Sequence, residues 1–157
     1  MEMKERLNYK DVSPDAIKAM RGVEKYVRES GLERSLYELV KIRASQINGC
    51  AYCIDMHTKD ARIAGETEQR IYALSAWRET PFYSERERAA LAWTEALTLI
   101  SENDVPDDLY ETVSKQFSEK EMVDLTMAII AINGWNRLAI SFRTVPGTYV
   151  PHEVSAV

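Results

Sequence analysis

Apolar residues recur every three or four positions along most of the chain, which is the spacing of one face of an α-helix. The first series follows a polar lead-in over residues 1–12 and the pair Ser13-Pro14, a typical N-cap and first helical residue. Its members are Ile17, Met20, Val23 and Val27, and Ser30-Gly31 predicts its end. No window shows the strict alternation of a half-buried strand. We therefore predict a compact all-α bundle of about six to seven helices.

Three S-x-x-E sequences mark further helix starts, because serine and glutamate at this spacing can cap each other's backbone N–H groups. They begin at Ser35, Ser84 and Ser118. The first predicts a helix from Leu36 to the stop signal Asn48-Gly49. The second precedes an apolar helix over residues 89–100, and the third a helix over about 119–142 that is apolar on nearly every side between 125 and 132. A helix without a polar face is central or lies in a subunit interface.

Two shorter helices complete the predicted bundle. Thr67 is expected to cap one that runs through Trp77 and ends before Pro81, and Pro106 to begin another that runs through Phe117. The tail after Val145-Pro146-Gly147 has no periodicity. At 157 residues, with no repeat and no linker, the chain is predicted to be a single domain over residues 1–157.

Composition narrows the function classes. A net charge of −5 with scattered lysines and arginines argues against a nucleic-acid partner. The charged start Met1–Arg6 is unlike a signal peptide, and no apolar run reaches membrane-spanning length. We therefore expect a cytoplasmic protein without membrane contact.

The segment from Asn48 to His57 holds both cysteines of the chain and one of its two histidines. A new helix over residues 50–64 would put Cys50 in its first turn, with Cys53 and His57 following on the same face. Unpaired N–H groups at a helix start favour a thiolate, and an imidazole one turn after Cys53 can accept its proton. In a reducing compartment, a C-x-x-C pair is more often catalytic or metal-binding than a structural staple. This pattern indicates redox chemistry.

A zinc site is the competing interpretation of the cysteines. Structural zinc usually takes four cysteine or histidine ligands, and only His57 and the tail residue His152 could join the pair. We therefore predict neither a metal nor a cofactor.

Other polar residues have simpler interpretations. Glu38 completes a capping box with Ser35, which would explain it without a functional role. Asp55 and Asp60 are expected to be solvated. Polar residues inside the last apolar helix need partners, so a structural hydrogen-bond network is expected for Trp135-Asn136-Arg137.

The sequence also contains a longer pattern, which consists of Glu38, eleven intervening residues, Cys50-Ala51-Tyr52-Cys53, three more residues and His57. It is the E-x(11)-C-x-x-C-x-x-x-H pattern of the alkylhydroperoxidase D-like family, within the carboxymuconolactone decarboxylase superfamily. The chain resembles this family over residues 35–147, including Lys41–Gly49 and Trp135-Asn136-Arg137. The resemblance implies an all-α fold assembled as trimers or hexamers, and thiol peroxidase activity with Glu38, Cys50, Cys53 and His57 in the active site. Decarboxylase members lack the cysteine pair.

The order of attack follows from two effects of different size. The field of a helix start favours Cys50 by about 0.3–1 kcal/mol, whereas a paired imidazole lowers a cysteine pKa by several units. The larger effect and the resemblance both favour Cys53 as the peroxidatic cysteine. Cys50 would then resolve the sulfenic acid, His57 act as base and Glu38 orient or recharge His57. An external dithiol, of thioredoxin or lipoyl type, would reduce the disulfide.

Two other functions fit the same residues. The chain could act as a dithiol–disulfide reductase of a protein partner, or as a non-enzymatic, redox-sensing helical oligomer. Neither the hydroperoxide substrate nor the physiological reductant follows from the sequence.

Overall fold

The computed structural model of the chain describes residues 2–152, and within them helices are the only regular elements. The all-α prediction is confirmed. The part of the chain that the structure describes has nine helical segments and not the six to seven expected, because a short helix lies inside the supposed lead-in and the segment after Thr67 divides in two. The segments are α1 (Tyr9–Val12), α2 (Pro14–Glu29), α3 (Arg34–Asn48), α4 (Ala51–Ile63), α5 (Glu68–Tyr72), the 3₁₀-helix η1 (Leu74–Glu79), α6 (Glu85–Thr98), α7 (Asp107–Ser114) and α8 (Glu119–Phe142).

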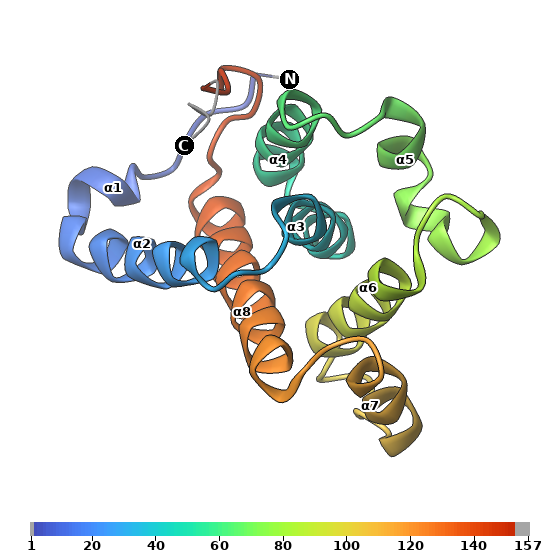
Figure 1. Cartoon of the computed structure of the whole chain (residues 1–157). Helices are drawn as coiled ribbons and strands as arrows, with labels where there is room; N and C mark the ends of the chain where they lie inside the picture. Colours follow the sequence, from blue (N-terminus) through green and yellow to red (C-terminus); the bar gives the residue numbers. More distant parts are fainter. Residues whose placement is uncertain (1, 153–157) are drawn as a thin grey trace.

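Helix α3 lies at the centre of the molecule, with α4, α6 and α8 packed around it (Figure 1). Every side chain from Leu36 to Ile42 is buried, which is the pattern expected of a helix surrounded by others. Helix α8 covers α3 on one side with Leu125, Ala128 and Ile132, all fully buried. Although α8 is the longest helix described, neither it nor any other described helix is apolar enough over sufficient length to cross a membrane.

Two of the three predicted capping boxes are present, those of Ser84 with Glu87 and Ser118 with Glu121. The prediction for Ser35 is wrong. Helix α3 begins at Arg34, two residues earlier than predicted, because the carbonyl of Glu33 accepts the first hydrogen bond, and no side chain caps it. Glu38 therefore lies beyond the first turn and has no capping role. Ser13 likewise precedes α2 without a side-chain cap bond.

The predicted stop at Asn48-Gly49 is confirmed, and it creates a tight reversal between α3 and α4. Gly49 has a φ of +69°, a left-handed conformation that glycine adopts without strain. The Cys50 N–H then donates to the carbonyl of Ser45 at 2.9 Å. Helix α4 begins at Ala51, so Cys50 is its N-cap and not a first-turn residue as predicted.

Helix α2 is joined to the bundle mainly through α8. The Tyr26 hydroxyl donates to Asp124 Oδ1 at 2.7 Å, and an ion pair joins the half-buried Glu24 to the buried Lys41 on α3. At Gly134 a Cβ atom would lie 2.7 Å from the terminal methyl carbon of Met20, so the missing side chain permits this close approach.

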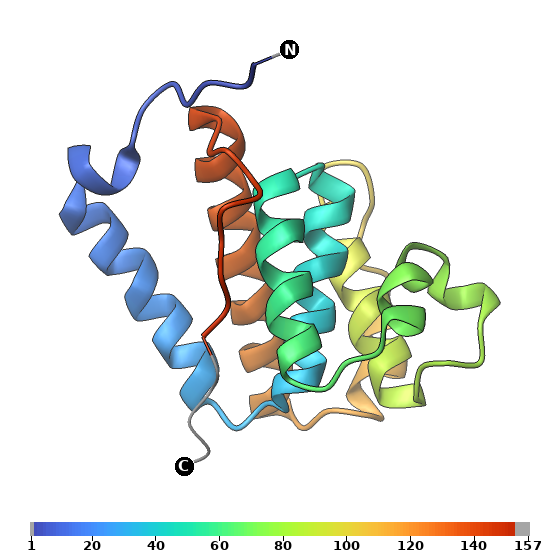
Figure 2. The same cartoon turned by 90° about the horizontal axis from the view of Figure 1, so that it is seen from above.

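The C-terminal segment runs back between α2 and α4 (Figure 2). Three contacts hold it on α4. The Gly147 N–H donates to Asp55 Oδ2 at 3.0 Å, Lys59 Nζ donates to the Tyr149 carbonyl at 3.0 Å, and the Tyr149 hydroxyl donates to Asp60 Oδ1 at 2.7 Å. The tail thereby becomes part of the wall of the site described next.

Candidate active site

A cavity of about 470 Å³ is bounded by residues of α1, α2, α3 and α4, by the end of α8 and by the C-terminal segment. Three of the four predicted site residues line it: Glu38 from α3, and Cys53 and His57 from α4. Cys50 lies behind Cys53 and is not part of the lining. The reversal at Gly49 thus brings together residues that are up to 19 positions apart in the sequence.

The two cysteines are joined by a disulfide bond, with their Cα atoms 5.3 Å apart. Each is only 1% exposed. Cys50 packs in an apolar cluster with Ala44 and Ile132, and its sulfur accepts the Cys53 N–H at 3.3 Å as the cap of α4. Of the two cysteine side chains, only that of Cys53 lines the cavity.

Glu38 and His57 form a buried pair across the α3–α4 interface. Glu38 Oε2 lies 3.3 Å from His57 Nδ1, an ion-pair contact without the alignment of a good hydrogen bond. Burial raises the pKa of Glu38, but the contact with His57 and the charge of Lys41 outweigh it and hold the pKa below its usual value. Glu38 is therefore ionised at neutral pH. His57 Nε2 has no hydrogen-bond partner among residues 2–152, which leaves it free to exchange a proton with a group in the cavity.

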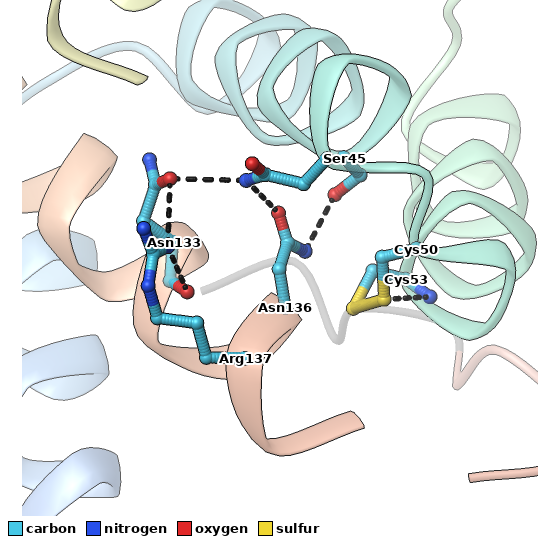
Figure 3. The surroundings of a disulfide bond; sticks show 7 residues. Ser45, Cys50, Cys53, Asn133, Asn136 and Arg137 are labelled. Carbon is cyan, nitrogen blue, oxygen red and sulfur yellow. Dashed lines mark hydrogen bonds between the residues drawn. A yellow bond between two sulfur atoms is a disulfide. The ribbon is translucent and has the colours of Figure 1, made fainter. Parts of the chain in front are cut away.

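A network of amides supports the turn that carries Cys50 (Figure 3). Asn136 is fully buried in α8; its Nδ2 donates to Ser45 Oγ at 3.0 Å, and its Oδ1 accepts from Asn48 Nδ2 at 2.9 Å. Asn48 also donates to Asn133 Oδ1 at 3.0 Å. The structural network predicted for Asn136 is therefore present. Its neighbour Trp135 instead faces α2, where its Nε1 donates to Glu24 at 3.3 Å.

The sequence pattern missed Asp60 and Tyr149 as parts of the site. Asp60 was expected to be solvated, but it is half-buried in the cavity wall and accepts the Tyr149 hydroxyl. Burial and this hydrogen bond raise the pKa of Tyr149. Asp55, also expected to be solvated, binds Lys59 and the Gly147 N–H. The tail carries no periodicity, so nothing in the sequence indicated that it folds onto α4.

Donor atoms of Glu38, His57 and Asp60 lie within 4.8 Å of one another, close enough to share a cation. The zinc alternative raised by the sequence is different, because it requires the cysteines, and these are bonded to each other. Glu38 is in contact with His57, and Asp60 accepts a hydrogen bond from the Tyr149 hydroxyl. Each carboxylate of this group is therefore engaged by another side chain of the site.

The chain is similar to several known proteins. The model of the carboxymuconolactone decarboxylase family matches residues 14–96. The uncharacterised protein YdfG of Bacillus subtilis is 51% identical over 139 residues, which cover 88% of this chain and 95% of YdfG.

Among solved structures, ATU0492 of Agrobacterium tumefaciens is 50% identical, with a TM-score of 0.90 over 93% of this chain and 100% of that one. ATU0492 is a protein of unknown function, described as a candidate antioxidant-defence protein AhpD. The debrominase Bmp8 shares the fold at 21% identity, with a TM-score of 0.78 over 88% of this chain and 74% of Bmp8. Since the family model covers more than half of the chain and YdfG aligns with most of it, the chain belongs to the carboxymuconolactone decarboxylase family.

Proposed function

We propose that the protein is a thiol-dependent peroxidase that reduces alkyl hydroperoxides or hydrogen peroxide through a Cys50–Cys53 dithiol–disulfide cycle. The observation that carries this proposal is the cavity in which Cys53, His57 and Glu38 meet, with the disulfide partner Cys50 directly behind. A thiol, a base and a carboxylate that orients the base are the groups that activate a cysteine nucleophile. The likeness to ATU0492 supports an antioxidant role, while the fold of Bmp8 accommodates a different chemistry.

In the reduced enzyme, the Cys53 thiolate attacks the terminal oxygen of the hydroperoxide. The O–O bond breaks, the leaving alkoxide takes a proton from His57, and Cys53 becomes a sulfenic acid. The Cys50 sulfur then attacks Cys53, the S–S bond forms, and hydroxide leaves and is protonated to water. An external dithiol returns two electrons and two protons to the pair and is itself oxidised to a disulfide.

The geometry supports Cys53 as the attacking residue. Cys53 lines the cavity and lies one helical turn before His57, whereas Cys50 is not among the residues that line the cavity. As the N-cap of α4, Cys50 accepts an N–H, and this hydrogen bond helps it to carry negative charge as it attacks Cys53. The two positions thus suit successive roles.

Burial of the disulfide limits which reductants can reach it, and it also affects the alternative function as a dithiol–disulfide reductase. A disulfide on the surface of a folded protein cannot reach two cysteine residues that are each 1% exposed, which weighs against a function as the reductase of folded protein partners. A small dithiol, or one carried on a slender arm such as a lipoyl group, can enter the cavity. We place this cycle in the cytoplasm, where dithiol reductants are maintained.

We also propose that the protein assembles as a trimer or hexamer. Half of the apolar side chains of α8 are buried within the protomer, but Val123 and Ile130 are 59% and 53% exposed on one face, with Met127 partly buried between them. Positions 123, 127 and 130 form a continuous apolar stripe. A second copy would remove this stripe from water.

Replacing either cysteine is expected to separate the two chemical steps. Cys53→Ser should abolish peroxide consumption, because the remaining thiol does not face the cavity. Cys50→Ser should consume one equivalent per subunit and stop at a sulfenic acid, which dimedone labelling and mass spectrometry detect. Sulfenate formation in Cys53→Ser but not in Cys50→Ser would reverse the assignment.

Replacement of Glu38 tests the proposed proton relay between Cys53 and His57, which Glu38 would assist. Since the pKa of Glu38 lies below its usual value, its charge is present at neutral pH and lost only on acidification. Glu38→Gln removes that charge, so the imidazolium of His57 is less stable and less Cys53 ionises. The rate at neutral pH should fall by about 10²–10⁴-fold, and the pH–rate profile should shift to higher pH.

Glu102→Gln provides the matched control. Glu102 is exposed in a turn, and its carboxylate forms no ion pair with any of residues 2–152. Its profile should be that of the wild type, and melting temperatures should show that both variants fold. An unchanged pH–rate profile in Glu38→Gln would remove Glu38 from the mechanism.

Sedimentation equilibrium at micromolar concentration is expected to give the mass of a trimer or hexamer. Ile130→Glu places a charge in the α8 stripe and should shift the distribution toward the monomer. The control is Ile63→Glu. Ile63 is also an exposed isoleucine, but it lies on α4 outside the stripe, so this change should leave the mass unchanged. A monomeric wild-type protein would contradict the proposed assembly.

A further inference from the structure

The cavity wall carries cationic side chains that the proposed peroxidase steps do not use. Arg21 and Arg28 come from α2 and Arg34 from the first residue of α3. None of the three lies within 4.0 Å of a carboxylate of residues 2–152, unlike Arg70, Arg78 and Arg86 elsewhere in the chain. Lys10, from α1, is a fourth lining cation without such a partner.

The acidic side chains of the same wall are already engaged. Glu24 pairs with Lys41 and accepts the indole N–H of Trp135. Glu38 contacts His57, and Asp60 accepts from Tyr149. Among residues 2–152, five cationic and three acidic side chains line the cavity, so the charge of this lining is opposite in sign to the net charge of −5 on the whole chain. This local excess of positive charge is available to an entering molecule.

The arrangement of these cations suits a ligand longer than hydrogen peroxide. Arg21 and Arg28 are seven residues apart, which places them on one face of α2 about 10 Å from each other. A volume of about 470 Å³ lies in the range of sites that enclose small organic ligands. The rest of the wall is largely apolar or aromatic, with Tyr9, Ile17, Tyr52, Met56, Trp135 and Ala139. The combined site accommodates a molecule with an apolar body and an anionic end.

We propose that the substrate is an organic hydroperoxide that carries a carboxylate, bound by Arg21, Arg28 and Arg34 while its hydroperoxide group reaches Cys53. This inference rests on the proposed peroxidase function and specifies its substrate class. Guanidinium groups bind carboxylates through paired, charge-assisted hydrogen bonds, which would orient the molecule along the cavity. The hydroperoxy acid is reduced to a hydroxy acid and water, and the two electrons come from the Cys50–Cys53 pair, which is restored by the external dithiol.

The test compares substrates that differ only in charge. Cumene hydroperoxide with a para-carboxylate is measured against its methyl ester, with linoleic acid hydroperoxide and its methyl ester as a flexible pair. The wild-type protein should prefer each acid by about 10-fold or more in kcat/KM, the range expected for hydrogen bonds to a charged group. This preference should decrease with added salt.

Variants assign the preference to particular residues. In Arg21→Gln, Arg28→Gln and Arg34→Gln, the ratio of acid to ester kcat/KM should fall toward one, with the largest fall when all three are combined. Lys18→Gln removes one positive charge from the exposed part of α2 outside the cavity and should retain the wild-type ratio. Melting temperatures verify that each variant folds.

The outcomes separate this inference from the proposed function. If tert-butyl hydroperoxide and the esters oxidise the thiols as efficiently as the acids do, the carboxylate site is wrong and the peroxidase proposal stands. If the acids are preferred equally by the wild type and the triple arginine variant, the assignment to these arginines is wrong. If no hydroperoxide oxidises the thiols, the proposed function itself fails.

Discussion

The reversal between α3 and α4 is the constraint on which the rest of the site depends. Gly49 adopts a left-handed conformation that ends α3, and the Cys50 N–H closes the turn by donating to Ser45. Helix α4 can then begin immediately and return along α3. Only this antiparallel packing places Glu38 of the first helix beside His57 of the second.

Buried polar groups fix this hairpin against the remaining helices. Asn136 joins α8 to the last turn of α3 through Ser45 and Asn48, and the Glu24–Lys41 ion pair joins α2 to α3. Removing such groups from water is unfavourable unless each finds a partner, so these contacts define one arrangement of helices and not several. Their consequence for function is a cavity of defined shape with a thiol on its wall. The same arrangement buries both cysteines in an apolar cluster, and of the two only Cys53 lines the cavity.

Much of this organisation could be predicted from the sequence because it depends on local signals. Serine and glutamate at the spacing of a capping box correctly predicted the starts of α6 and α8, and Asn48-Gly49 correctly predicted the end of α3. The box at Ser35 failed because the backbone of Glu33 begins the helix earlier, which leaves Glu38 for a tertiary contact that spacing alone could not reveal. Asp60, Tyr149 and the arginines of α2 meet only through tertiary packing. The tail that brings Tyr149 to α4 has no periodic pattern, so its position followed from no sequence rule.

The most direct test of the account is the stoichiometry of the first turnover in fully reduced wild-type protein under anaerobic conditions. One equivalent of tert-butyl hydroperoxide is added per subunit, and free thiols, tert-butanol and the resulting disulfide are quantified together. We predict one molecule of alcohol for each two thiols lost, and peptide mapping should show Cys50 joined to Cys53 within one subunit. Thiols that persist while the hydroperoxide remains intact, or thiol loss without a matching amount of alcohol, would contradict it.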